Sequence, residues 1–194
     1  MIDIDYALVR ESLSGTEDEC GDTGMIRKQD DVLFLALVDV LGHGREAHKI
    51  ACMADEYIAD HFQEELTELM NGLHTHLRGT RGAVAGFCRL YIPDGTLYFT
   101  GIGNITTRIY GENSHTLVPR DGIIGFSIPV PEKQKTVIKS NELLILSSDG
   151  IKEHFRREDY PGLLEGSSET IARSLIRLLK KNDDASCIVL RYGI

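Results

Sequence analysis

Four short acidic motifs carry the chemistry that this sequence could perform. They are Cys20-Gly21-Asp22, Asp39-Val40-Leu41-Gly42-His43-Gly44, Ser147-Ser148-Asp149-Gly150 and Asp183-Asp184-Ala185-Ser186. At least three of them stand where an apolar, strand-like run begins or ends. Carboxylates at strand ends, beside glycines that let the backbone approach closely, suit a site for hard divalent cations. If the fold brings the motifs together, the pattern predicts a metal-dependent hydrolase, with phosphoryl chemistry as the first candidate.

Each motif also has an ordinary structural interpretation when it is taken alone. Asp39 could belong to a plain strand–turn–helix connection, and Asp149-Gly150 to a common turn. Asp183-Asp184 and Asp22 could lie in solvated loops. The functional hypothesis therefore depends on all four motifs meeting in space. Carboxylates packed together repel one another strongly, and a bound cation is what makes such a cluster tolerable.

The composition is that of a globular protein. With 194 residues, of which 42% are hydrophobic and 26% charged, the chain can bury a continuous core, and we expect one domain over residues 1–194. The net charge of −9 disfavours binding to nucleic acid or to anionic lipid. No apolar stretch approaches the ~20 residues of a membrane span, and the N-terminus lacks the features of a secretory signal. We therefore expect a cytoplasmic protein with reduced thiols, of which Cys52, Cys88 and Cys187 would be buried.

The hydrophobic patterns predict an α+β fold. Residues 32–38 form a near-continuous apolar run, as expected of a strand buried on both faces. Helical spacing predicts helices over 44–62, about 64–77 and 168–180. Further strands are expected at 4–10, 25–29, 83–92, 97–101, 106–110, 135–139, 143–146 and 186–192. The strands at 135–139 and 143–146 are expected to form a hairpin. Strands and helices in separate blocks indicate two facing sheets with helices outside.

The order and spacing of the four motifs resemble those of the PPM family of metal-dependent serine/threonine phosphatases. Asp-x-x-Gly-His-Gly follows one apolar strand, Ser-Asp-Gly follows a second, and Asp-Asp-x-Ser precedes the last. The similarity spans about Gly21 to Leu190 and is greatest to the small bacterial branch of SpoIIE, RsbU and the stand-alone RsbX type. The resemblance implies a four-layer α-β-β-α sandwich, in which helices flank two mostly antiparallel sheets.

The resemblance also implies a site for two metal ions, Mn²⁺ or Mg²⁺. Asp39 would bridge both ions, and a metal-activated water would attack phosphorus without a covalent enzyme intermediate. Asp22 and the carbonyl of Val40 would serve one ion, and Asp149 and Asp183 the other. The implied catalytic set is Asp22, Asp39, Asp149 and Asp183, with Asp184 as the alternative metal ligand to Asp183.

The substrates implied by the resemblance are phosphoserine or phosphothreonine residues on STAS-domain proteins of a stress-signalling module. His43 could contact the substrate or protonate the leaving oxygen, although a polar residue at a helix start is the competing interpretation. Val40 stands where the family usually has glycine, and this departure supports a second hypothesis. In that hypothesis the chain is a weakly active or inactive PPM-fold module that binds a phosphoprotein. A scaffold merely stabilised by metal is a third.

Overall fold

The computed structural model describes residues 2–152, 159–180 and 182–193. Its strands are β1 (Ile4–Glu11), β2 (Asp22–Gln29), β3 (Val32–Val40), β4 (Ala83–Tyr91), β5 (Thr96–Ile102), β6 (Thr106–Tyr110), β7 (His115–Leu117), β8 (Gln134–Val137), β9 (Leu143–Ser147) and β10 (Ala185–Tyr192). Its helices are α1 (Arg45–His61), α2 (Leu66–His76) and α3 (Ser168–Leu179), with a short 3₁₀ turn, η1, at Glu17–Glu19. None of the described helices is long and apolar enough to cross a membrane.

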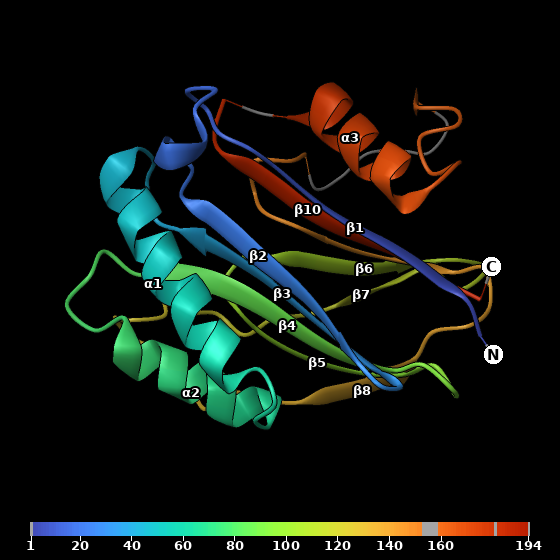
Figure 1. The fold of residues 1–194 in the computed structure, drawn as a ribbon, viewed down its shortest axis with the longest axis horizontal. Helices are drawn as coiled ribbons and strands as arrows, with labels where there is room; N and C mark the ends of the chain where they lie inside the picture. Colours follow the sequence, from blue (N-terminus) through green and yellow to red (C-terminus); the bar gives the residue numbers. More distant parts are fainter. Residues whose placement is uncertain (1, 153–158, 181, 194) are drawn as a thin grey trace.

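The elements form four layers (Figure 1). One sheet has the strand order β1-β10-β9-β6-β7, and the other has the order β2-β3-β4-β5-β8. Helix α3 packs on β1 and β10 of the first sheet, whereas α1 and α2 pack on the second. Adjacent strands in both sheets run antiparallel. The predicted α-β-β-α sandwich of the α+β class is confirmed.

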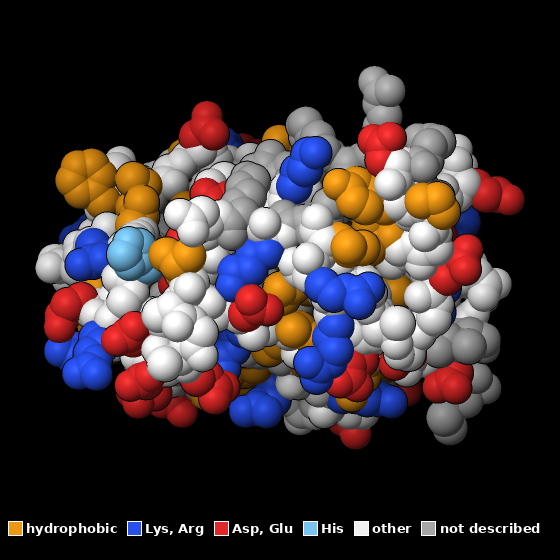
Figure 2. All heavy atoms as spheres, turned by 90° about the horizontal axis from the view of Figure 1, so that it is seen from above, with side chains coloured by type: hydrophobic (Ala, Val, Ile, Leu, Met, Phe, Trp, Pro, Cys, Tyr) orange, Lys and Arg blue, Asp and Glu red, His pale blue; other side chains and the backbone are white. Residues whose placement is uncertain are grey.

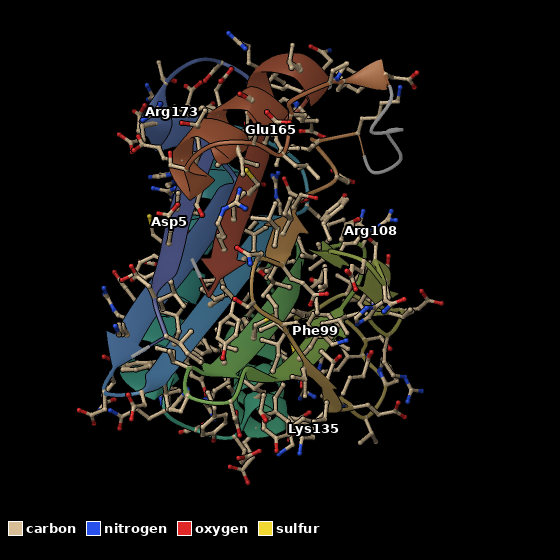
Figure 3. All side chains as sticks on the ribbon, turned by 90° about the vertical axis from the view of Figure 1, so that its right-hand side faces the viewer. Asp5, Phe99, Arg108, Lys135, Glu165 and Arg173 are labelled. Atoms are coloured by element: carbon tan, nitrogen blue, oxygen red, sulfur yellow. The ribbon has the colours of Figure 1, made fainter. Side chains whose placement is uncertain are left out.

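Strand β3 shows why its sequence is apolar throughout. Leu33, Leu35 and Leu37 point into the core between the two sheets, while the residues between them point toward α1 and α2. Side chains alternate along a strand, so a strand covered on both faces needs apolar residues at every position. Phe99 of β5 enters the same inter-sheet core and is seen between the sheets in Figure 3.

The predicted hairpin between 135–139 and 143–146 is wrong. Strand β8 pairs with β5 in one sheet, whereas β9 pairs with β6 and β10 in the other. The residues between them change sheets: Ile138 N donates to Gly95 O, and Asn141 N donates to Tyr192 O. Asn141 takes a positive φ of 66°, which Asn tolerates better than most residues. Two strand-like runs joined by a polar turn look alike in sequence whether or not they pair with each other.

The four cysteines are free thiols, but the prediction of burial is wrong for one of them. Cys88 and Cys187 are buried as expected, and so is Cys20. Cys52 is exposed, because the buried face of α1 runs through Ala47, Ala51, Ala54 and Ile58 and leaves position 52 outside it.

Candidate active site

Asp22 and Asp39 face each other across the paired strands β2 and β3. Asp39 stands two residues after Leu37, so it has the same orientation as the leucines that fill the inter-sheet core. Directly opposed residues on antiparallel strands project from the same face of the sheet. The two carboxylates therefore share the inter-sheet side at the end of the second sheet. Asp22 opens β2 with only 1% of its surface exposed, so it does not lie in a solvated loop.

The other two motifs meet at the neighbouring end of the first sheet. Asp149 lies two residues after the end of β9, and Asp183-Asp184 directly precedes β10. Because β9 and β10 are antiparallel and Ser147 pairs with Cys187, the end of one strand lies beside the start of the other. Asp149 is half-buried, Asp183 is exposed and Asp184 is buried.

Hydrogen bonds join the two sheets at this end. Ser148 Oγ, which is fully buried, donates to Asp22 Oδ2 at 2.7 Å. Asp184 accepts from Gly21 N and from Leu13 N, both at 2.7 Å, so each of its carboxylate oxygens is held by a backbone N–H. These contacts fix the positions of the acidic motifs relative to one another. Nothing in the local sequence indicates this role of Ser148, because its partner lies 126 residues away.

Asn104 is a further residue of the site. It follows β5, and its Nδ2 donates to Asp149 Oδ2 at 2.8 Å. An outer residue that holds one oxygen of a ligating carboxylate orients the other oxygen toward the metal. The motif Gly101-Ile102-Gly103-Asn104 is visible in the sequence, but only the fold shows which carboxylate the amide contacts.

The loop after Asp39 is shaped for close approach. Val40 is the last residue of β3 and is fully buried, and its N–H donates to Gly21 O at 3.2 Å. The φ of Val40 is not positive, so valine in place of the glycine usual in the family introduces no backbone strain here. His43 is exposed in the turn that leads to α1.

Arg81 brings a positive charge to the same loop. Its Nη1 donates to Leu41 O at 3.3 Å, and a Cβ on Gly42 would come within 2.6 Å of that nitrogen. Gly42 also has a φ of +83°, a backbone conformation that favours glycine, whereas the flexible, exposed end of Arg81 can move away from an added Cβ. The guanidinium thus lies against the loop that follows Asp39.

The electrostatics of the site are those of crowded carboxylates. Burial is the main cause that raises the pKa of Asp39, and the charges of four neighbouring aspartates raise that pKa further. Those four are Asp22, Asp149, Asp183 and Asp184. Burial also raises the pKa of Asp22, while the hydrogen bond from Ser148 opposes the rise. The aspartates of the four motifs are therefore close enough to interact electrostatically.

The donor set fits a hard divalent cation in its chemistry. The facing side chains are carboxylates, which Mn²⁺ and Mg²⁺ prefer, and their mutual repulsion is relieved by positive charge. Among the described ranges, no three His, Cys, Asp or Glu side chains already surround one point at ligand distance. Forming a coordination sphere there requires carboxylates to turn toward a shared ion.

Known proteins are similar to this chain in sequence and in fold. The phosphoserine phosphatase RsbX of Bacillus subtilis (strain 168) is 21% identical over 179 residues, which cover 88% of this chain and 86% of RsbX. A structure described as "The bacterial stressosome: a modular system that has been adapted to control secondary messenger signaling" matches with a TM-score of 0.88 and 28% identity, over 97% of this chain and 100% of that one. The crystal structure of RsbX in complex with magnesium matches with a TM-score of 0.82 and 18% identity, over 99% and 100%.

The family model for stage II sporulation protein E (SpoIIE) matches residues 29–193. That range includes three of the four acidic motifs and every strand of the sandwich except β1 and most of β2. This chain therefore belongs to the SpoIIE family and is a phosphatase domain with the PP2C-type fold.

Proposed function

We propose that this chain is a metal-dependent protein serine/threonine phosphatase that hydrolyses phosphoserine or phosphothreonine on a signalling protein. The observation that carries the proposal is the meeting of the acidic motifs at one end of the sandwich, with Asp22 and Asp39 face to face. Asp149 and Asp183 raise the pKa of Asp39 through their charge, so they belong to the same site. A cluster of this kind, unneutralised, would cost the fold stability without serving it.

The metal ligands would be divided between the two sheets. Asp39 would bridge two ions, with Asp22 and the Val40 carbonyl on one side and Asp149 and Asp183 on the other. Mn²⁺ or Mg²⁺, when bound there, supplies a water of lowered pKa and screens the phosphoryl oxygens. The protein's own part is to hold the carboxylates in place, through Ser148 on Asp22 and Asn104 on Asp149.

The structure favours Asp183 over Asp184 as the ligand. Both oxygens of Asp184 accept short bonds from backbone N–H groups, and its side chain is buried. Asp183 is exposed, and its Oδ1 accepts from the N–H of Asp184 at 2.9 Å. A ligand needs an oxygen free to face the ion, and Asp183 has one.

The surroundings of the site suit a folded phosphoprotein. His43 is exposed in the loop after Asp39, and Arg81 contacts the same loop, so we propose that both contact the phosphoryl group. Phe126 is 81% exposed and belongs to the turn that packs beside Gly82 and Leu41. At the left end of the view in Figure 2, hydrophobic side chains lie beside a His and Lys or Arg side chains. Such a mixed surface fits a protein partner better than a small ester.

The proposed partner is a phosphorylated STAS-domain protein of a stress-response module, in the cytoplasm. The support is the similarity to RsbX and to the stressosome structure, together with four free thiols, which are typical of a reducing compartment. The alternative, a weakly active or inactive module that binds a phosphoprotein, was supported in the sequence by Val40 alone. Val40 lies in β3 and its φ is not positive, so valine at this position gives little support to a loss of activity.

The test is hydrolysis of p-nitrophenyl phosphate and of a phosphoserine protein, with and without Mn²⁺, for wild type and Asp39→Asn. We expect metal-dependent activity that falls at least about 100-fold in the variant, the loss typical of removing one electrostatic catalytic group. Asp60→Asn, an exposed position on α1, is the matched control and should keep full activity. Turnover that survives Asp39→Asn would contradict the proposal, whereas phosphoprotein binding without turnover would favour the alternative.

A further inference from the structure

A cavity of about 250 Å³ lies between α1 and the strands β1 and β2. It is lined by Arg10, Thr23, His48, Ala51, Cys52, Asp55 and Glu56. Arg10 connects its wall to the acidic site, because Arg10 Nη1 donates to Asp22 O at 3.3 Å. Within the wall, Thr23 Oγ1 donates to Asp55 Oδ1 at 3.4 Å. The cavity has no part in the phosphatase chemistry described above.

This cavity contains a nucleophile, a base and a group that orients the base. His48 Nδ1 lies 3.1 Å from Cys20 O, and a carbonyl oxygen only accepts, so Nδ1 carries the proton. The other ring nitrogen, Nε2, lies 3.5 Å from Cys52 Sγ. In the neutral ring that nitrogen has a free lone pair, which can take the thiol proton. A thiol beside a base whose tautomer is fixed by a third group is the arrangement of an activated cysteine.

Cys52 is also the accessible thiol of the folded chain. Cys20, Cys88 and Cys187 are each no more than 2% exposed, and burial raises the pKa of all three thiols. A buried thiol that keeps its proton does not react with solutes, because the thiolate is the nucleophile. Cys52 faces solvent and the cavity together.

We propose that Cys52 is a site of thiol–disulfide exchange with low-molecular-weight disulfides, activated by His48, and that the cavity holds the adduct. His48 Nε2 takes the proton of Cys52, and the thiolate attacks one sulfur of the disulfide. The disulfide's own S–S bond breaks as the new bond to Sγ forms. The second sulfur leaves as a thiolate and accepts a proton from His48. Cys52 is oxidised and the departing thiol is the reduced product, so atoms and electrons balance.

The adduct would lie against groups that support Asp22. Filling the cavity separates His48 from Cys52 and crowds Arg10, whose guanidinium holds the carbonyl of Asp22. We therefore expect modification to lower phosphatase activity, an effect that rests on the proposed function. The thiol chemistry itself does not depend on that function, since it needs neither metal nor phosphoprotein.

The experiment treats the intact, metal-free protein with oxidised glutathione and follows the mass of the chain with time. We expect one glutathione per wild-type chain and none on Cys52→Ser. The matched variant His48→Asn keeps an N–H donor for Cys20 O but lacks the base at Nε2. Its rate should fall at least about tenfold, since a positioned base contributes more than that to proton transfer.

A second measurement keeps the test decisive if His48→Asn folds poorly. In denaturant all four thiols are open, so the rate per thiol there is that of an unassisted cysteine. Cys52 in the folded protein should react faster than this reference. An equal or slower rate, or equal rates for wild type and a folded His48→Asn, would overturn the proposal. If Mn²⁺-dependent activity is present but unchanged by the adduct, the link to Asp22 is wrong.

Discussion

At the residue scale, the two adjacent aspartates before β10 differ in burial and in hydrogen bonding. Asp184 is bonded at both oxygens to the N–H groups of Gly21 and Leu13, and so ties the start of β10 to the segments that carry Asp22. Asp183 lies exposed next to it. Asp184 thus holds the segments of the site together, and in our proposal Asp183 is the residue that binds the ion. Sequence alone does not separate them, because the pattern Asp-Asp-x-Ser offers two identical side chains.

The pair can be distinguished by replacing each with alanine. Asp184→Ala leaves two backbone N–H groups without acceptors, so the metal-free protein should lose about 1–3 kcal/mol or more of unfolding free energy. Asp183→Ala removes one repelling charge and should leave that free energy unchanged or slightly higher, while Mn²⁺ binding weakens. Urea melts and Mn²⁺ titrations of both variants measure this. A stable Asp184→Ala with lost metal binding would reverse the assignment.

At the element scale, the site depends on how closely β9 and β10 approach each other. A Cβ at Gly150 would lie 1.7 Å from Asp184 O, which is backbone and cannot rotate away. Gly150→Ala should therefore push the two strand ends apart, lowering both stability and activity, with an overpacking cost of about 1–3 kcal/mol. Gly79→Ala is the control: its φ is +82° but nothing lies within 4 Å. It should lose stability through strain yet keep its activity per folded molecule. Equal activities in the two variants would contradict this.

The same scale shows what sequence could and could not predict. The apolar run of β3 and the helical spacing of α1 identified their elements, because burial on two faces or on one stripe leaves a local pattern. The separation of β8 from β9, and the contact of Ser148 with Asp22, arise from distant segments and have no local signal. Cys52 could have been placed on the surface, since it falls outside the period of the buried residues of α1.

At the scale of the whole molecule, the crowded carboxylates link stability to pH. Asp22 and Asp39 have raised pKa values in the folded state, so between the ordinary carboxyl pKa and the raised one the folded chain binds more protons than the unfolded chain. The unfolding free energy of the metal-free protein must then fall as pH rises through that window. Divalent metal acts in the opposite sense, because it binds the deprotonated carboxylates and its stabilisation grows with pH.

Thermal melts from about pH 5 to about pH 8 test this linkage. The Tm of the metal-free wild type should fall with pH more steeply than that of Asp39→Asn, by at least about 2–4 °C, the shift that 1 kcal/mol produces in a chain of this length. Asp60→Asn controls for the loss of one charge from a chain whose net charge is −9, and it should follow wild type. Mn²⁺ should raise Tm most at the upper end of the range. Parallel curves for wild type and Asp39→Asn would mean that neither burial nor neighbouring charges raise the pKa of Asp39, which contradicts a buried, crowded carboxylate site.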